Sequence, residues 1–395
     1  MINRKLVKVA AASIILLTLY FLWSWINAES TAQETSKEIL ETNKIDELRP
    51  DTVSTTAAAS KKSPLILYWG KAWGINGPEE GSLMDECILT YNRSKISDAI
   101  AVVFHFTTIN GNQIPWQHYR DKRQIFVWWC AEGPRLFGRN GLREFDGGFF
   151  NWTWTFKRSA DVLRYYGSRD GALKFVKKGK KAIDDVISFK KKMALWGVSR
   201  CSGTNGAIKR MEYYKALVAA GLNITTFGGC FPDVENIPRQ FPMLFEPKWK
   251  EHKFYLAFEN AIHCRDYITE KFWDNALKND MVPVVWGPTK EDVLSVAPLD
   301  SFIHTDDFDS PAKLAEYLQF LDKNDDEYRK YFRWREDETM TDEKMIRMTQ
   351  ERYPDLNIEL TPKSLCTRLL ENEETKIIPS VTDEFITSER PECLS

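Results

Sequence analysis

The stretch Lys253–Pro288 constrains the fold of this chain more than any other part of the sequence. Phe254–Phe258 is an aromatic and apolar run with the length of a buried strand, and Val282–Trp286 is a second such run. Between them, apolar residues recur at helical spacing over Asp266–Asn279, and a Gly-Pro pair ends the pattern. This order predicts a strand–helix–strand unit of a parallel α/β sheet.

Polar residues gather where the first strand of this predicted unit ends and the helix begins. In parallel α/β sheets, ligands bind at the edge where strands end and helices start. A purely structural junction would not need so many polar groups, so we expect a binding site here. The residues concerned are Glu259, Asn260, Tyr267, Glu270 and Lys271.

A second unit of the same kind precedes the first. Met193–Ser199 and Asn223–Phe227 read as strands, with a helix over Ala207–Ala220 between them. Arg210 opens this helix and Lys271 opens the helix of the central stretch. Helix starts offer free N–H groups and a partial positive charge, which together with these cations would hold a pyrophosphate. The pattern favours a nucleotide-sugar site, the alternative being that both cations are ordinary surface residues.

Further apolar runs, at residues 65–69, 87–90, 99–106 and 125–130, predict a first α/β domain upstream. The connector Gly167–Lys192 is basic and amphipathic, which favours a solvated helix over a nucleic-acid or membrane surface. The net charge of −2 gives no reason to expect nucleic acid as a partner. The five histidines show no HExxH spacing and the cysteines no CxxC…CxxC spacing, so we expect no metal site.

The N-terminus predicts a membrane anchor. Val9–Ile26 carries no charge and, at roughly 27 Å as a helix, is just long enough to cross a bilayer. Arg4, Lys5 and Lys8 precede it, so the positive-inside rule places the N-terminus in the cytoplasm and the rest of the chain on the lumenal or extracellular side. A cleaved signal peptide is the alternative, although the run is longer than usual for one. Residues 27–63 are polar and predict a flexible stem.

Cysteines and glycosylation sequons agree with this topology. The chain has seven cysteines, so at least one stays unpaired, and Cys87 is expected to pair with Cys366 or Cys393. Candidate N-glycosylation sites are Asn92, Asn151 and Asn223.

The segment FENAIHCRDYITEKFWDNALKNDMVPVVWGP resembles the signature of the α-1,3-fucosyltransferases, glycosyltransferase family 10. The resemblance runs from about Leu195 to the YFRWRE segment at Tyr331–Glu336, and it is weaker upstream, in FVWWCAEGP and FFNWTWTFKRSAD. It implies an α/β, GT-B-like fold with two Rossmann-type domains facing a cleft, in a single-pass type II Golgi membrane protein. It also implies an inverting transfer of L-fucose from GDP-β-L-fucose to the 3-hydroxyl of GlcNAc in glycoprotein or glycolipid glycans. No cofactor or metal is obligatory in the family, and whether a divalent metal stimulates the reaction stays open.

The resemblance also implies roles for single residues. Arg210 and Lys271 match residues on the donor diphosphate, and Glu132 matches the acidic residue proposed as general base. Gly133 departs from the Glu-Ser-Pro that the family more often shows at this point. Relatives with similarly placed cysteines imply a Cys201–Cys230 bridge. The other positions that match the donor pocket are Glu259, Asn260, Tyr267, Glu270 and, beside the departures Lys157 and Ser159, Arg158.

Trp128 and Trp129 precede Glu132 and would offer aromatic faces to an acceptor sugar, the alternative being that they pack in the core. The predicted domains are a cytoplasmic tail (1–8), a signal-anchor (9–26), a stem (27–63), an acceptor-side Rossmann-like domain (64–190), a GDP-fucose-binding Rossmann-like domain (191–360) and a C-terminal extension (361–395).

The acceptor is the least constrained part of the prediction. N-acetyllactosamine-type glycans come first, with the innermost GlcNAc of N-glycans or direct O-fucosylation of a protein as alternatives. An inactive, membrane-anchored glycan-binding protein is the non-enzymatic alternative. It would require the loss of catalytic positions, yet Glu132, Arg210, Glu270 and Lys271 are all present.

Overall fold

The computed structural model describes residues 63–72, 78–109, 123–133, 143–231, 247–358, 363–371 and 376–387. The predicted anchor and stem, residues 9–26 and 27–63, lie outside this part except for Ser63. Within the described ranges, no helix combines the length and the hydropathy needed to cross a bilayer. Residues from Ser63 onward form one compact unit, built on two sheets.

The N-terminal sheet has the strand order β2-β3-β1-β4-β5-β6-β7 and is parallel except for the β2–β3 hairpin. Alternate residues of its central strands belong to two different cores: Ile66 and Val103 face one, Leu67 and Phe104 the other. Both faces are therefore covered, as in other parallel sheets. The strands are β1 (Leu65–Tyr68), β2 (Leu83–Met84), β3 (Cys87–Thr90), β4 (Ala99–His105), β5 (Ile125–Cys130), β6 (Trp152–Thr155) and β7 (Val162–Leu163), with 3-10 turns η2 (Arg93–Asp98) and η5 (Arg143–Phe145).

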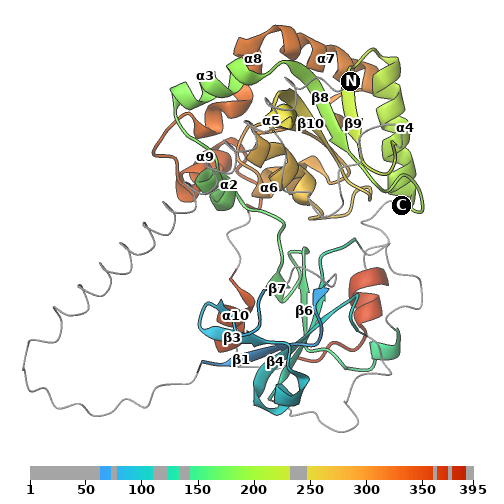
Figure 1. The fold of residues 1–395 in the computed structure, drawn as a ribbon, viewed down its shortest axis with the longest axis vertical. Coiled ribbons are helices and arrows are strands. Elements are labelled where there is room, and N and C mark those ends of the chain that lie inside the picture. Colours follow the sequence, from blue (N-terminus) through green and yellow to red (C-terminus); the bar gives the residue numbers. More distant parts are fainter. Residues whose placement is uncertain are drawn as a thin grey trace, which may run out of the picture. The chain divides into compact units, whose positions relative to one another are not determined.

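The C-terminal end of the chain packs on this first sheet. Helix α10 (Leu365–Glu371) lies beside β1 and β3 in Figure 1, and a disulfide joins its Cys366 to Cys87. The π-helix η10 (Thr382–Thr387) supplies Phe385 to the opposite core, so the chain end contacts both faces. Described residues of the predicted extension 361–395 thus belong to the cores on both faces of the N-terminal sheet.

The C-terminal sheet is entirely parallel, with the strand order β12-β11-β10-β8-β9. Strand β10 again alternates between two cores, with Phe254 and Leu256 on one side and Tyr255 and Ala257 on the other. Helices cover both sides (Figure 1). The elements are β8 (Lys192–Gly197), α4 (Asn205–Ala219), β9 (Ile224–Phe227), α5 (Pro247–Lys250), β10 (His252–Phe258), η6 (Lys271–Ala276), η7 (Leu277–Asn279), β11 (Val282–Trp286), α6 (Lys290–Val296), β12 (Ile303–His304), η8 (Thr305–Asp307), α7 (Pro311–Lys323), α8 (Asp325–Arg329), η9 (Lys330–Arg335) and α9 (Asp342–Arg352).

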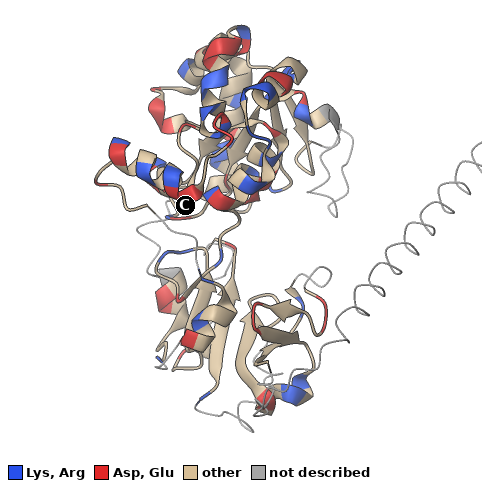
Figure 2. Cartoon of the chain, turned by 90° about the vertical axis from the view of Figure 1, so that its left-hand side faces the viewer, with Lys and Arg blue, Asp and Glu red and all other residues tan. Residues whose placement is uncertain are grey.

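The packing of the connector does not follow the domain boundary predicted at residue 190. Its helices α2 (Arg169–Phe175) and α3 (Lys180–Phe189) pack with the second sheet, through Leu173 and Ile183 respectively. Basic and acidic residues are mixed along the helices around this sheet in Figure 2, which agrees with a solvated, mixed-charge surface.

The helix predicted over Asp266–Asn279 is shorter than expected. Residues 266–269 form a loop, and the helical part consists of the π-helical η6 and the 3-10 turn η7. Asp266 adopts a φ of 66°, a left-handed conformation that an α-helix does not allow. The loop matters for function because it carries Tyr267 and Thr269 towards the end of β10.

The covalent predictions have mixed outcomes. The Cys201–Cys230 bridge is confirmed, Cys366 is the partner of Cys87, and Cys130 is a buried free thiol. The sequons at Asn92 and Asn223 are exposed, but Asn151 is only 5% exposed and its side-chain nitrogen donates a hydrogen bond to the Lys376 carbonyl at 2.8 Å. Because a glycan would have to replace that bond inside the core, Asn151 was wrongly predicted as a glycosylation site of the folded chain.

Candidate active site

The site is built at the carboxyl end of β10, on Glu259. The backbone N–H of Glu259 donates to the Trp286 carbonyl and continues the ladder with β11. Its side chain is buried, and Oε1 accepts hydrogen bonds from the backbone N–H and the hydroxyl of Thr269, at 2.9 and 2.7 Å. The loop before η6 is thereby fixed to the strand end.

Lys271, the first residue of η6, is held between two carboxylates. Its Nζ lies 3.0 Å from Glu259 Oε2 and 3.1 Å from Glu270 Oε1, and it donates to the Thr269 hydroxyl at 2.8 Å. Burial alone would lower the pKa of Lys271, but the two carboxylates raise it above its ordinary value, so the amine stays charged. For Glu259, burial is the largest effect and raises the pKa. For Glu270, burial acts to raise the pKa, but the charge of Lys271 and the hydrogen bonds from Lys271 and Thr269 together lower it.

Arg210 lies in the second turn of α4, one turn further along than the predicted helix start. It is buried, and its guanidinium donates to the Phe258 carbonyl at 2.8 Å and to the Arg200 carbonyl at 2.7 Å. Its Nε is buried and, among the described residues, has no acceptor. Arg210 therefore ties the end of β10 to the loop after β8, while its Nε–H has no partner among the described residues.

The N-terminus of α4 meets the loop after β10. The Thr204 hydroxyl accepts from the Ala207 N–H and donates to the Asn260 carbonyl at 3.1 Å. A Cβ on Gly206 would lie 2.4 Å from that carbonyl oxygen, so only glycine permits this approach. Asn260 thus lies where the start of α4 and the end of β10 come together, as the sequence predicted for a donor site.

Glu132 follows β5 of the first sheet and faces the same cluster. The Tyr267 hydroxyl lies 3.4 Å from Glu132 Oε2, and the Tyr166 hydroxyl donates to the Ala131 carbonyl at 2.7 Å. Burial raises the pKa of Glu132, while the positive charges of Lys271 and Arg200 partly oppose that shift. Tyr267 is itself fully buried, with its pKa raised well above the ordinary value, so its hydroxyl stays protonated.

The two tryptophans before Glu132 have different surroundings. Trp128 is wholly buried in the first core, 4.4 Å between ring centroids from Phe385, so its prediction as an acceptor contact was wrong and the core alternative holds. Trp129 is partly exposed and stacks on Trp154 at 5.0 Å, and its contact with an acceptor stays a prediction.

Arg158, predicted to contact the donor, bridges two segments of the compact unit. Its Nε lies 2.5 Å from Asp266, its Nη2 lies 3.0 Å from Asp292, and its backbone N–H donates to Asp266 as well. The two carboxylates raise the pKa of Arg158, although burial acts against them. These contacts link the chain after β6 to the loop that carries Tyr267.

Comparison with protein families shows which family the chain belongs to. The model of the C-terminal part of "Glycosyltransferase family 10 (fucosyltransferase)" matches residues 187–384, and the model "Fucosyltransferase, N-terminal" matches residues 61–167. The chain belongs to glycosyltransferase family 10. The predicted family resemblance is confirmed, and the chain is a glycosyltransferase of the α-1,3-fucosyltransferase class.

Relatives of this fucosyltransferase are known in mammals. The Homo sapiens 4-galactosyl-N-acetylglucosaminide 3-alpha-L-fucosyltransferase FUT6 is 36% identical over 298 residues, which are 73% of this chain and 76% of the relative. The Bos taurus 3-galactosyl-N-acetylglucosaminide 4-alpha-L-fucosyltransferase FUT3 is 33% identical over 304 residues, 74% and 77% of the two chains. A crystal structure of an alpha1,3-fucosyltransferase with GDP-fucose aligns with a TM-score of 0.47 and 17% identity, over 82% of this chain and 95% of that one.

Several residues of this fucosyltransferase site were not singled out from the sequence. Thr269 holds both Glu259 and Lys271, Tyr166 holds the carbonyl next to Glu132, and Asp266 holds Arg158. Thr269 directly precedes Glu270 and Lys271, which the sequence had singled out, so it was within reach of sequence reasoning. Tyr166 and Asp266 gave no such signal, because their partners are distant in sequence.

Proposed function

We propose that this enzyme transfers L-fucose from GDP-β-L-fucose to the 3-hydroxyl of a GlcNAc residue in a glycan, with inversion at the anomeric carbon. The observation that carries the proposal is the approach of Glu132 to the cluster of Lys271 and Arg210 through the hydroxyl of Tyr267. A base for the acceptor and cations for the leaving group are the two functions that such a transfer needs. The relatives' names, which specify N-acetylglucosaminide acceptors and fucosyl transfer, support the substrate class.

In the proposed reaction, Glu132 removes the proton of the acceptor hydroxyl while its oxygen attacks the anomeric carbon of fucose. The bond from that carbon to the phosphate oxygen breaks, and the electron pair leaves with GDP. Attack on the face opposite the leaving group inverts the configuration. The raised pKa of Glu132 suits this role, because it makes the carboxylate a stronger base than an exposed one.

The cationic side of the site would hold the diphosphate. Lys271 stays charged at neutral pH, and the N-terminus of α4 adds backbone N–H groups and its partial positive charge. Glu270 is 38% exposed at its side chain. We expect it to give way to phosphate at Lys271 and to accept hydrogen bonds from sugar hydroxyls.

The cellular setting belongs to the same proposal. A signal-anchor at residues 9–26 and a stem at 27–63 would place this catalytic unit in the Golgi lumen as a type II membrane protein. Disulfides at Cys87–Cys366 and Cys201–Cys230 suit such an oxidising compartment.

The proposed function is tested by incubating the full-length chain in detergent with GDP-fucose and three acceptors: N-acetyllactosamine, a chitobiose-core glycopeptide and a folded protein domain without glycans. We expect fucose on the 3-hydroxyl of GlcNAc in N-acetyllactosamine, as determined by linkage analysis of the product. Transfer to the glycopeptide core or to the bare domain alone would replace this acceptor by the corresponding alternative. Absence of transfer to all three would contradict the proposal.

A further inference from the structure

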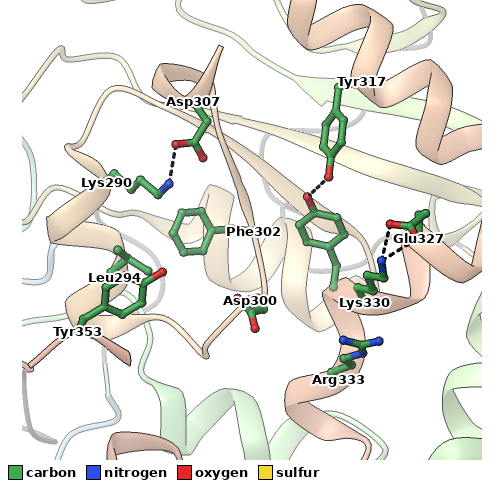
Figure 3. Close-up of a pocket in the computed structure, with 11 residues that line it drawn as sticks. Lys290, Leu294, Asp300, Phe302, Asp307, Tyr317, Glu327, Lys330, Arg333 and Tyr353 are labelled. Carbon is green, nitrogen blue, oxygen red and sulfur yellow. Dashed lines mark hydrogen bonds and ion pairs between the residues drawn. The ribbon is translucent and has the colours of Figure 1, made fainter. Parts of the chain in front are cut away.

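A hollow of about 350 Å³ lies on the C-terminal half, apart from the residues assigned to transfer. Its walls come from α6, from the chain on both sides of β12, and from α7, α8 and η9 (Figure 3). The volume falls within the range of small-molecule sites, roughly 300–1,000 Å³. The hollow is thus large enough to hold a small ligand or one end of a longer one.

Aromatic rings form much of the wall. Phe302, Tyr317, Tyr331 and Tyr353 line the hollow, and all four are partly exposed rather than buried in the core. The hydroxyls of Tyr317 and Tyr331 share a hydrogen bond of 2.8 Å (Figure 3). Because one proton serves that bond, the pair keeps one donor and free acceptor positions for a ligand.

Charged groups at the rim are mostly paired with each other. Lys290 lies 2.5 Å from Asp307, and Lys330 lies 2.6 Å from Glu327. Of the cations that line the hollow, Arg333 alone has no carboxylate partner within the part of the chain described. The rim therefore offers donors and acceptors in alternation but little uncompensated positive charge.

This combination fits a neutral sugar better than an anion. A phosphate or a sulfate would have to displace the carboxylate partner of each lysine before it could use that charge, and Arg333 is the one lining cation that has no such partner among the described residues. A sugar ring presents an apolar C–H face, which aromatic side chains can cover, and hydroxyls that both donate and accept. A purely apolar ligand would remove water from the charged groups at the rim without giving them new hydrogen bonds.

The hollow lies at the same edge of the C-terminal sheet as the transfer site. Lys290 follows β11 and Asp307 follows β12, at the same sheet edge at which Glu259 follows β10. Strand β12 lies two strand spacings from β10, roughly 10 Å. A glycan of several sugars is long enough to contact both the end of β10 and the hollow.

We infer that this hollow is a second glycan-binding site, which takes a neutral sugar of the acceptor several residues away from the reacting GlcNAc. The inference rests on the proposed function for the identity of the acceptor. It adds a preference for long, neutral acceptors over short ones.

The test uses Leu294, which lines the hollow from α6 and takes no part in the transfer site. Leu294→Trp should fill the hollow. Glu291→Trp puts the same side chain on the exposed side of the same helix and is the matched control. Tyr331→Phe, which removes one hydroxyl and keeps the ring, is a second variant that should not disturb folding.

Two measurements are made on the full-length chain: direct binding of an oligosaccharide of three N-acetyllactosamine units by calorimetry, and KM for this hexasaccharide and for the single disaccharide. We expect L294W to weaken binding and raise KM for the hexasaccharide by roughly threefold to tenfold. Tyr331→Phe should give a smaller effect in the same direction. KM for the disaccharide and for GDP-fucose should be unchanged, and E291W should resemble the wild type.

The outcomes separate the two proposals. Equal hexasaccharide binding in wild type, L294W and Tyr331→Phe, or no binding at all, would overturn the second site even if transfer occurs. Absence of transfer together with L294W-sensitive binding would overturn the proposed function and keep the site. A change in GDP affinity in L294W would show damage to the fold, and Tyr331→Phe would then decide.

Discussion

At the scale of single residues, the protonation of Glu132 depends on what surrounds it. Burial raises its pKa, and the buried hydroxyl of Tyr267 is placed to donate to its carboxylate at 3.4 Å. A hydrogen bond to the charged form favours that form and lowers the pKa. Tyr267 therefore works against the effect of burial, and the two together set the pH range in which Glu132 can accept a proton.

This balance predicts the pH dependence of transfer. A general base works only when deprotonated, so the rate is high above the pKa of Glu132 and falls as the pH drops through it. Tyr267→Phe removes the donor and should raise that pKa, so the acidic limb of the kcat/KM profile should move to higher pH. Tyr166→Phe, which affects the Ala131 carbonyl instead, is the control. A limb that stays in place in Tyr267→Phe would separate Tyr267 from the titration of the base.

At the scale of elements, η6 is attached to β10 through one buried ion pair. Glu259 is 2% and Lys271 15% exposed at the side chain, and Thr269 bonds to both. Removing one partner of a buried pair leaves the other as an uncompensated charge, which typically costs about 3–5 kcal/mol. The start of η6 is thus both a structural joint and the proposed phosphate site.

Lys271→Ala should therefore have two effects. It should lower the free energy of unfolding by roughly 3 kcal/mol, seen as a lower Tm, and weaken GDP binding in calorimetry at least tenfold. Lys278→Ala, which breaks the more exposed Lys278–Asp274 pair on the same segment, should change stability by no more than about 1 kcal/mol. Unchanged GDP affinity in a folded Lys271→Ala protein would move the donor site elsewhere.

The bridge made by Arg158 leads to a different expectation. Lysine has one ammonium group and cannot reach Asp266 and Asp292 with separate nitrogens as Arg158 does. Arg158→Lys should cost roughly 1–3 kcal/mol of stability and lower the transfer rate, because the loop with Tyr267 loses its support. GDP affinity should stay close to that of the wild type. A selective loss of GDP affinity at unchanged Tm would instead support the prediction that Arg158 contacts the donor.

The elements also show how far the sequence could lead. The strand over Val282–Trp286 and the central strand before Glu259 are confirmed, because continuous apolar runs in a parallel sheet leave few other solutions. The cluster of Glu259, Glu270 and Lys271 could be expected because the strand end and the helix start are close in sequence. The bonds from Arg210 to two backbone carbonyls could not, since they depend on how α4 packs on the sheet.

At the scale of the whole molecule, the last described segments of the chain pack on the N-terminal sheet. The Cys87–Cys366 disulfide spans 279 residues, and Phe385 packs on Trp128 from the opposite side. The sequence allowed a bridge from Cys87 to Cys366 or Cys393, but it could not show that Phe385 packs in the core around Trp128, because nothing local records a contact across that distance. For the same reason, Trp128 could not be assigned to the core before its partner was known.

Removing this long-range bridge should destabilise the protein substantially. Cys87→Ser with Cys366→Ser should lower the free energy of unfolding by about 2–5 kcal/mol, measured by denaturant titration of the full-length chain. Cys201→Ser with Cys230→Ser removes a bridge with a much shorter separation of 29 residues and should cost less. Equal losses in the two double variants would argue against a role for the bridge in holding the chain end on the first sheet.

The proposed transfer depends most on Glu132 as the base opposite the cationic cluster. The direct measurement is single-turnover transfer by Glu132→Gln at saturating GDP-fucose, with GDP affinity measured by calorimetry on the same protein. We predict a loss of transfer of roughly 10²- to 10⁴-fold with GDP affinity within about twofold of the wild type. Wild-type transfer in this variant would contradict the account, since no base would then be needed at this position.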